Sequence, residues 1–314
     1  MIIFQDLETI CVSEPCVVTI GKFDGIHRGH AELIRAARRF ADACPEPVSV
    51  AVFTFDTSSA TLLTAKERRA YLSKLGADVL VECEFGPQLI TMEAGDFVRD
   101  ILKDRLRMCH AVTGEDFRFG YERRGDPAFL LEAGRSCGFT AETVPAVEYR
   151  GSKISSTRIR EALQQGKMEE VQDMLGFPFF VTGEIIHGRQ LGRTIGVPTT
   201  NLIPGRGKLL PPNGVYCSRS FAGGEQFRGI TNIGTKPTVE GGFVGVETYL
   251  FDCSEDLYGA SQKVELLHYI RPEQKFRDLQ ELKARIRLDE AEGRAFFQRP
   301  ENGRVSGVFA GNHA

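Results

Sequence analysis

Residues 19–30 read Thr-Ile-Gly-Lys-Phe-Asp-Gly-Ile-His-Arg-Gly-His, and they decide the predicted fold of the first half of the chain. An apolar run over residues 17–20 predicts a strand that ends at Gly21, and the apolar spacing over residues 31–43 predicts a helix. The glycines between them allow a tight turn and a close approach of the backbone to a ligand. Because a helix N-terminus presents free N–H groups, the stretch predicts a phosphate-binding turn.

Two histidines lie at the end of this turn. His27 and His30 are three residues apart, so both can face one ligand. A lone histidine is usually structural or solvated, but a pair beside glycines at a strand-to-helix turn favours a functional role. A metal site is the weaker interpretation, because no third ligand lies nearby in the sequence.

Two further stretches suit anions. Residues 153–160 read Lys-Ile-Ser-Ser-Thr-Arg-Ile-Arg, where Ser155 or Ser156 can cap a helix and three basic residues can bind an anion. Residues 114–120 read Gly-Glu-Asp-Phe-Arg-Phe-Gly and follow a predicted strand. Ligands bind in the loops at the carboxyl edge of a parallel sheet, so both stretches are candidate binding loops.

The pattern of elements changes once along the chain. Strand-like residues 48–55, 79–82, 111–113 and 140–144 alternate with helix-like residues 66–75, 97–106 and 127–137. This alternation predicts a Rossmann-like parallel sheet with helices on both faces. Beyond residue 177 come short apolar runs over residues 179–186, 214–220, 227–233, 245–251 and 263–270. They predict an antiparallel β-barrel or sandwich, followed by a terminal helix over about residues 279–297 with a Glu281–Arg285 pair. We therefore predict two domains, residues 1–177 and 178–314.

Composition narrows the function classes. The length of 314 residues fits two domains, and the net charge of −3 argues against a dedicated nucleic-acid binder. None of the eight cysteines forms a C-x-x-C pair, which favours free thiols in a reducing cytoplasm over a zinc site or a disulfide framework. We expect no signal peptide and no membrane-spanning segment.

Residues 183–201 are the richest stretch of the second half. Gly188, Gly192 and Gly196 recur at every fourth position, with arginine and glutamine between them, which excludes a membrane dimer face. No Walker motif occurs, so the glycine spacing alone is a weak indication of a flexible loop over phosphates.

The first half resembles the nucleotidyltransferase superfamily with the H-x-G-H signature. With residues 114–120 and 154–160 it is similar to the adenylyltransferase module of bacterial bifunctional riboflavin kinase/FAD synthetases. The resemblance implies that His27 and His30 contact the α-phosphate of ATP. It further implies nucleotide-binding roles for Gly21, Phe23, Asp24, Gly25, Asp116, Ser156, Thr157 and Arg160.

The second half resembles riboflavin kinases. Their Gly-x-Pro-Thr-Ala-Asn pattern appears here as Gly196-Val-Pro-Thr-Thr-Asn201, and matches continue at residues 213–216, 232–238, 245–252, 257–259 and 271–276. The resemblance implies that Thr199 and Asn201 hold Mg²⁺ on ATP, and that Glu247 is the base that accepts the hydroxyl proton. It implies ATP contacts for Gly188, Gly192, Arg193, Pro198 and Thr199. Glu247, Tyr249 and Phe251 share one face of their predicted strand.

Together these resemblances imply an enzyme that phosphorylates riboflavin to FMN and adenylylates FMN to FAD, using ATP in both steps. FMN and FAD are then products, and riboflavin, FMN and ATP are the ligands. The chain departs from the family pattern at residues 56–59, which read Asp-Thr-Ser-Ser where relatives have a proline-rich loop. The resemblance implies that this loop lies at the flavin end of the adenylylation site. The flavin-binding residues stay unassigned.

Three alternatives remain open at this point. The chain could be a kinase with an impaired adenylyltransferase, a flavin-binding regulatory protein without turnover, or an adenylyltransferase for a different phosphate acceptor. Product analysis with riboflavin, ATP and Mg²⁺ tests them: FMN without FAD would favour the first or the third, and the absence of ADP would favour the second.

Overall fold

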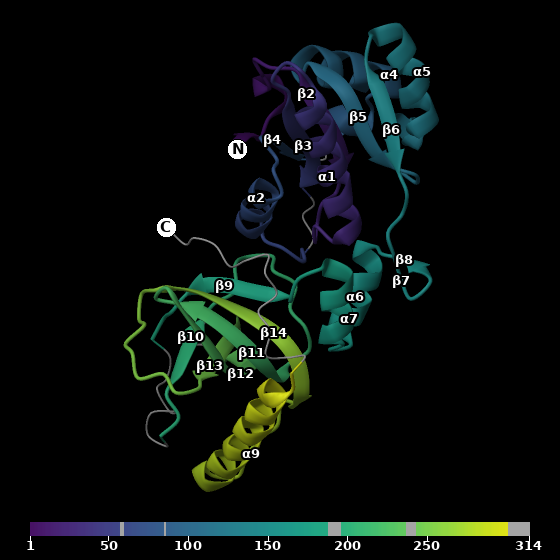
Figure 1. Ribbon diagram of the computed structural model, residues 1–314. Helices are drawn as coiled ribbons and strands as arrows, with labels where there is room; N and C mark the ends of the chain where they lie inside the picture. The colour runs from purple at the N-terminus through teal and green to yellow at the C-terminus, as the bar shows by residue number, and fades with distance from the viewer. Residues whose placement is uncertain (57–59, 85, 188–195, 237–242, 301–314) are drawn as a thin grey trace. The chain divides into compact units, whose positions relative to one another are not determined.

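Two compact units make up the chain. The computed structural model describes residues 1–56, 60–84, 86–187, 196–236 and 243–300. The units are Met1–Ser156 and Thr157–Ala314, and each is built around its own sheet (Figure 1). The predicted boundary between residues 177 and 178 stays a prediction. In the structure, helix α7 (Met168–Leu175) packs against strand β14 (Ser261–Pro272) of the second unit.

A six-stranded parallel sheet forms the first unit, as predicted. Its strand order is β1-β4-β3-β2-β5-β6. The strands are β1 (Ile2–Phe4), β2 (Cys16–Gly21), β3 (Ser49–Asp56), β4 (Val79–Glu84), β5 (Met108–Gly114) and β6 (Thr140–Val144). The main helices are α1 (Arg28–Ala43), α2 (Ala65–Lys74), α5 (Pro127–Cys137) and η2 (Phe97–Arg105), and the shorter ones are α3 (Pro87–Ile90), α4 (Ala94–Asp96), η1 (Leu7–Thr9) and η3 (Tyr121–Arg123).

Helices cover both faces of this sheet. On one face, Val18 and Ile20 of β2 join a core that includes Val98 and Leu102 of η2. On the other, α1 packs against β2, β3 and β5. Because alternate residues of a strand point to opposite faces, this two-sided burial explains the continuous apolar runs in the sequence.

Local sequence signals set several helix ends. Thr64 and Glu67 form a capping box at the start of α2, and Asp126 caps α5 with Pro127 in its first turn. The helix predicted over residues 97–106 is a π-helix over Phe97–Arg105. The sequence did not predict β1 or the small hairpin of β7 (Glu148–Tyr149) and β8 (Ser152–Lys153).

The second unit is an antiparallel barrel, and its strand order is β10-β13-β12-β11-β14-β9. Its remaining strands are β9 (Phe180–Glu184), β10 (Thr199–Leu202), β11 (Gly214–Ala222), β12 (Glu225–Lys236) and β13 (Phe243–Leu250). The two edges meet at a bridge in which the Ile186 N–H donates to the Asn201 carbonyl at 2.8 Å. Two helices, α6 (Ser156–Gln164) and α7, precede the barrel.

Helix α9 (Leu279–Gln298) packs against β11 and β12 of the barrel sheet (Figure 1), and its buried residues all lie in its C-terminal half. Phe296 and Phe297 join Ile230 and Phe251 in one apolar cluster. A Cβ at Gly293 would lie 2.8 Å from Ile230 Cγ2 and 3.0 Å from Phe251 Cζ, so the backbone of α9 approaches the sheet closely there.

The predicted Glu281–Arg285 pair in α9 is wrong. Arg285 instead pairs with the buried Asp289 at 2.9 Å, as does Arg271 of β14 at 2.6 Å, while Glu281 accepts from the Arg277 N–H. The buried carboxylate competes better for Arg285, because it lies in a less solvated position than Glu281.

Candidate active sites

A cavity of about 260 Å³ opens at the carboxyl ends of β2, β5 and β6. Its lining comes from the three stretches that the sequence singled out, including Gly21, His27 and His30 from the turn, Asp116 from the loop after β5, and Ser156 at the start of α6. The cavity lies where β2 has β3 on one side and β5 on the other, which is the switch point of the sheet. The structure therefore brings together residues that are up to 135 positions apart, from Gly21 to Ser156.

The two histidines form a stacked pair. Their ring centroids are 3.7 Å apart, and His27 Nδ1 accepts from the His30 N–H at 3.3 Å as the cap of α1. With Nδ1 as acceptor, the neutral His27 ring carries its proton on Nε2 and can donate from there. His30 Nδ1 is buried without a hydrogen-bond partner among the described residues. Both rings thus keep hydrogen-bonding capacity for a ligand.

Both histidines are neutral at neutral pH. Burial, aided by the Lys153 charge, lowers the pKa of His27 to about 4. Burial, with His27 and Lys153, also holds the pKa of His30 well below its usual value. The fixed positive charge of the cavity wall therefore comes from Lys153, whose ammonium forms an ion pair with Asp116 and lowers the pKa of that carboxyl.

The glycines of the turn do not supply its positive φ angles, although Gly21 and Gly29 both line the cavity. The positive φ angles fall on Phe23 (43°) and Ile26 (45°), both fully buried. At Gly21 and Gly29 space is tight, since a Cβ would lie 3.3 Å from the Phe23 ring in one case and 3.2 Å from the His27 ring in the other. Non-glycine residues keep such angles only where their surroundings fix them.

Three predicted nucleotide ligands in the turn do not line the cavity. Phe23 packs on His30, with ring centroids 4.8 Å apart, and Gly25 is buried. The Asp24 carboxylate accepts from the Leu62 N–H at 2.8 Å, which ties the turn to the segment before α2. The role of these three residues as ATP contacts stays a prediction. Their observed contacts stabilise the turn on the side that does not line the cavity.

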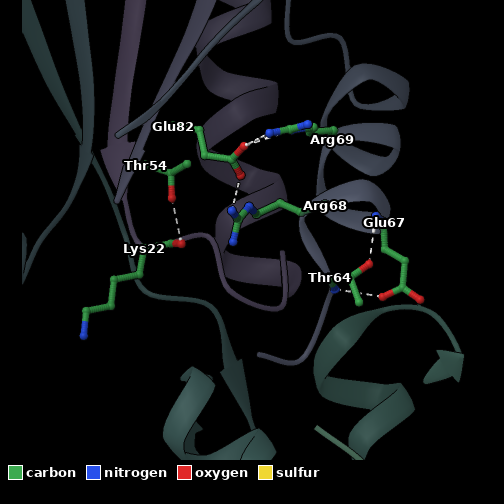
Figure 2. Close-up of polar contacts among 7 residues, drawn as sticks. All are labelled: Lys22, Thr54, Thr64, Glu67, Arg68, Arg69 and Glu82. Carbon is green, nitrogen blue, oxygen red and sulfur yellow. Dashed lines mark hydrogen bonds and ion pairs between the residues drawn. The ribbon is translucent and has the colours of Figure 1, made fainter. Parts of the chain in front are cut away.

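A second support lies beside the turn (Figure 2). The Thr54 hydroxyl donates to the Lys22 carbonyl at 2.8 Å, and Thr54 is the register partner of Glu82. The buried Glu82 carboxylate accepts from Arg68 and, at 2.6 and 2.8 Å, from Arg69. These contacts fix the first turns of α2 against the end of β4.

A group of polar side chains on β10, β12 and β13 is the candidate site of the second unit. The Thr199 hydroxyl donates to Glu247 Oε1 at 2.7 Å. Asn201 of β10 and Asn232 of β12 lie directly opposite Glu247 in the two flanking strands. Because directly opposed residues share a face, the two amides and the carboxylate lie side by side. These oxygen donors suit Mg²⁺, which prefers hard oxygen ligands.

Pro198 and Thr199 also line a small cavity of about 50 Å³. Ile185, Leu250 and Leu257 supply its apolar walls, and Tyr258, which stacks on His187 at 3.8 Å, borders it. Gly188, Gly192 and Arg193, predicted ATP contacts, lie outside the described residues.

Comparison with known proteins matches both units. The model of the FAD synthetase family matches residues 10–158, and that of the riboflavin kinase family matches residues 175–297. The bifunctional riboflavin kinase/FMN adenylyltransferase of Escherichia coli K12 is 39% identical over 293 residues, covering 90% of this chain and 93% of the relative. The Haemophilus influenzae protein described in the same words is 35% identical, covering 91% of this chain and 96% of the relative.

This chain belongs to the bifunctional riboflavin kinase/FMN adenylyltransferase family. A crystal structure from Streptococcus pneumoniae, described as that of a macrolide-efflux protein, shares the fold with a TM-score of 0.84 and 30% identity, covering 93% of this chain and 98% of the other. Within the described ranges of this chain, no helix is both long and apolar enough to cross a membrane.

The family resemblance assigned no role to Lys153 or Asn232, although Lys153 is one of the three basic residues that were predicted to bind an anion. Lys153 lies at the end of β8, and its position in the cavity wall depends on the β7–β8 hairpin that the sequence did not predict. Asn232 belongs to residues 232–238, which resemble riboflavin kinases. Its position beside Glu247 follows from the strand register, which the sequence does not give. Residues 57–59 of the departing loop lie outside the described residues, and Thr157 and Arg160 lie on α6 in the second unit.

Proposed function

We propose that the chain phosphorylates riboflavin to FMN with ATP and then adenylylates FMN with ATP to give FAD and pyrophosphate. The observation that carries the proposal is that two separate polar sites, one in each unit, bring together key residues of the family signatures. They are His27, His30, Asp116 and Ser156 in the first unit and Thr199, Asn201 and Glu247 in the second. Family membership supports both activities, and the geometry supports the residue roles below.

In the kinase step, the terminal ribityl hydroxyl of riboflavin attacks the γ-phosphorus of ATP. The new O–P bond forms as the bond to the β–γ bridging oxygen breaks, and ADP leaves. Glu247 accepts the hydroxyl proton, and the Thr199 hydroxyl that donates to it fixes the orientation of the carboxylate. Thr199 and Asn201 would hold Mg²⁺, which supplies neutralising charge on the phosphates when bound.

In the adenylylation step, a phosphate oxygen of FMN attacks the α-phosphorus of ATP and pyrophosphate leaves. His27 and His30, kept neutral by burial, donate hydrogen bonds to the α-phosphate. Lys153 and the N-terminus of α1 supply positive electrostatic potential at the same cavity. Asp116 and Ser156 line the space for the nucleotide, and the free thiols of all eight cysteines fit a cytoplasmic enzyme.

Chromatographic analysis of the products formed from riboflavin, ATP and Mg²⁺ tests the proposal. The chain should give FMN first and FAD later, and omission of Mg²⁺ should abolish both products. FMN without FAD would instead support the kinase-only alternative that the Asp56–Ser59 sequence suggests, or an adenylyltransferase for a different phosphate acceptor. An absence of both products would refute the enzyme assignment.

A further inference from the structure

A second carboxylate lies on the same sheet face as Glu247. Asn232 and Gly234 of β12 share a face, and across the register they oppose Glu247 and Gly245 of β13. The two glycine positions themselves carry no side chain. Glu273, which follows the end of β14, reaches over Gly234 from outside the two strands.

The position of Glu273 follows from two contacts. A Cβ at Gly234 would overlap the Glu273 carboxylate and lie 2.9 Å from its Cδ, so the carboxylate occupies the space that a side chain at 234 would fill. The Asn213 amide donates to Glu273 Oε2 at 3.3 Å and to the Thr235 hydroxyl at 3.4 Å. Glu273 is itself exposed, so its oxygens can accept further hydrogen bonds.

The opposite direction along the strands is closed. Beyond Glu247, the face carries Tyr249 and Ile230, which belong to or pack against the apolar cluster beneath α9. The backbone of α9 lies close to Ile230 there, because a Cβ at Gly293 would be 2.8 Å from Ile230 Cγ2. Among the side chains that the structure describes, the glycine side of this face therefore leaves the approach to Glu247 for an acceptor molecule. Thr199 and the small cavity beside it lie on the β10 side of Glu247.

The spacing suits a short polyol. Two residues along a strand cover about 7 Å, so Glu273 above Gly234 lies roughly that far from Glu247. A chain with a hydroxyl on each successive carbon can span this interval and meet Glu247 at one end and Glu273 at the other. Asn232 and Asn201 lie beside Glu247 and offer further hydrogen-bonding groups.

We propose that Glu273 is a specificity-determining residue of the kinase site, which accepts a hydrogen bond from an inner hydroxyl of the ribityl chain while Glu247 receives the terminal one. This inference rests on the proposed kinase function. Gly234 then makes room for the Glu273 carboxylate, and Gly245 leaves space for the polyol beside it. Asn213 is a positioning residue that orients Glu273.

Steady-state kinetics with two acceptors test the inference. One acceptor is riboflavin, and the other is a flavin with a 5-hydroxypentyl side chain, which keeps only the terminal hydroxyl. Glu273→Ala should lower kcat/KM for riboflavin by about 10- to 100-fold, mainly through KM, because a hydrogen bond to a charged group is lost. Glu273→Gln, which keeps an acceptor oxygen, should lose less. The KM for ATP should not change.

The hydroxypentyl flavin separates recognition from a structural effect. Wild-type protein should use it poorly, and Glu273→Ala should reduce its kcat/KM no further. Equal losses on both acceptors, or no loss on riboflavin, would overturn the inference. Glu225→Gln, an exposed carboxylate at the β11–β12 turn, is the matched control and should behave as wild type. If the wild-type chain phosphorylates neither flavin, the kinase function itself fails, and the inference fails with it.

Discussion

Glu247 has its Oε1 fixed by the Thr199 hydroxyl, and an amide lies on each side of it in the sheet. Glu247→Gln keeps the shape and the hydrogen bond from Thr199 but removes the proton acceptor. We expect kcat for FMN formation to fall by about 10²- to 10⁴-fold, with little change in the KM for ATP. Adenylylation of added FMN by the same sample should proceed at the wild-type rate, which serves as the folding control.

His268 gives the second unit a pH-dependent contact. It lies 2.6 Å from Glu169 of α7, and the hydrogen bond with that carboxylate raises the pKa of His268 and lowers the pKa of Glu169. A raised histidine pKa contributes stability below its ordinary value of about 6.5, and this contribution is lost as the pH rises through the folded-state pKa. The carboxylate contribution is lost on the acid side, as the pH falls through the lowered pKa of Glu169.

His268→Gln should therefore destabilise the protein more at pH 5.5 than at pH 8.5. Because both side chains are partly exposed, at 38% and 60%, the difference should stay below about 1 kcal/mol. Urea unfolding of wild type and variant at the two pH values measures it. A larger loss at the alkaline value would contradict the assigned direction.

Between elements, the Glu82 cluster connects α2 to the end of β4. Glu82→Ala leaves Arg68, whose side chain is 3% exposed, without its carboxylate partner. We expect a loss of about 3–5 kcal/mol in the free energy of unfolding of the first unit. Denaturant unfolding measures it, and Glu132→Ala, which removes an exposed pair with Arg135, should cost less than about 1 kcal/mol. Similar small losses in both variants would show that the cluster contributes little.

The difference between local sequence patterns and contacts between distant residues explains what the sequence could predict. Caps such as Thr64 and Asp126, the apolar runs and the three binding stretches are local patterns, so the helices, most strands and the residues of the first cavity were predictable. The sequence could not indicate that Asp24 binds the Leu62 N–H, or that Glu273 reaches Gly234. These contacts depend on the strand order and on the path of the chain between elements, which short sequence patterns do not determine.

For the molecule as a whole, the two proposed sites should be separable by substitution. His30→Ala should form FMN but no FAD, and Glu247→Gln should convert FMN to FAD but leave riboflavin unchanged. Because FMN released by one variant can be used by the other, a mixture of the two should form FAD from riboflavin after a lag. Chromatographic time courses measure the FMN and FAD that the single variants and the mixture form. If each variant performs its own step but the mixture forms no FAD, the assumption that FMN is released into solution is wrong.

The close approach of α9 to the sheet at Gly293 limits which amino acids this position can accept. In the interior of a helix, glycine costs about 1 kcal/mol relative to alanine, so helix propensity alone would favour almost any replacement. The methyl group of alanine would nevertheless collide with Ile230 and Phe251. In a saturation library of this helix, exposed positions such as Leu288 should accept most amino acids, whereas position 293 should return glycine alone among the functional clones.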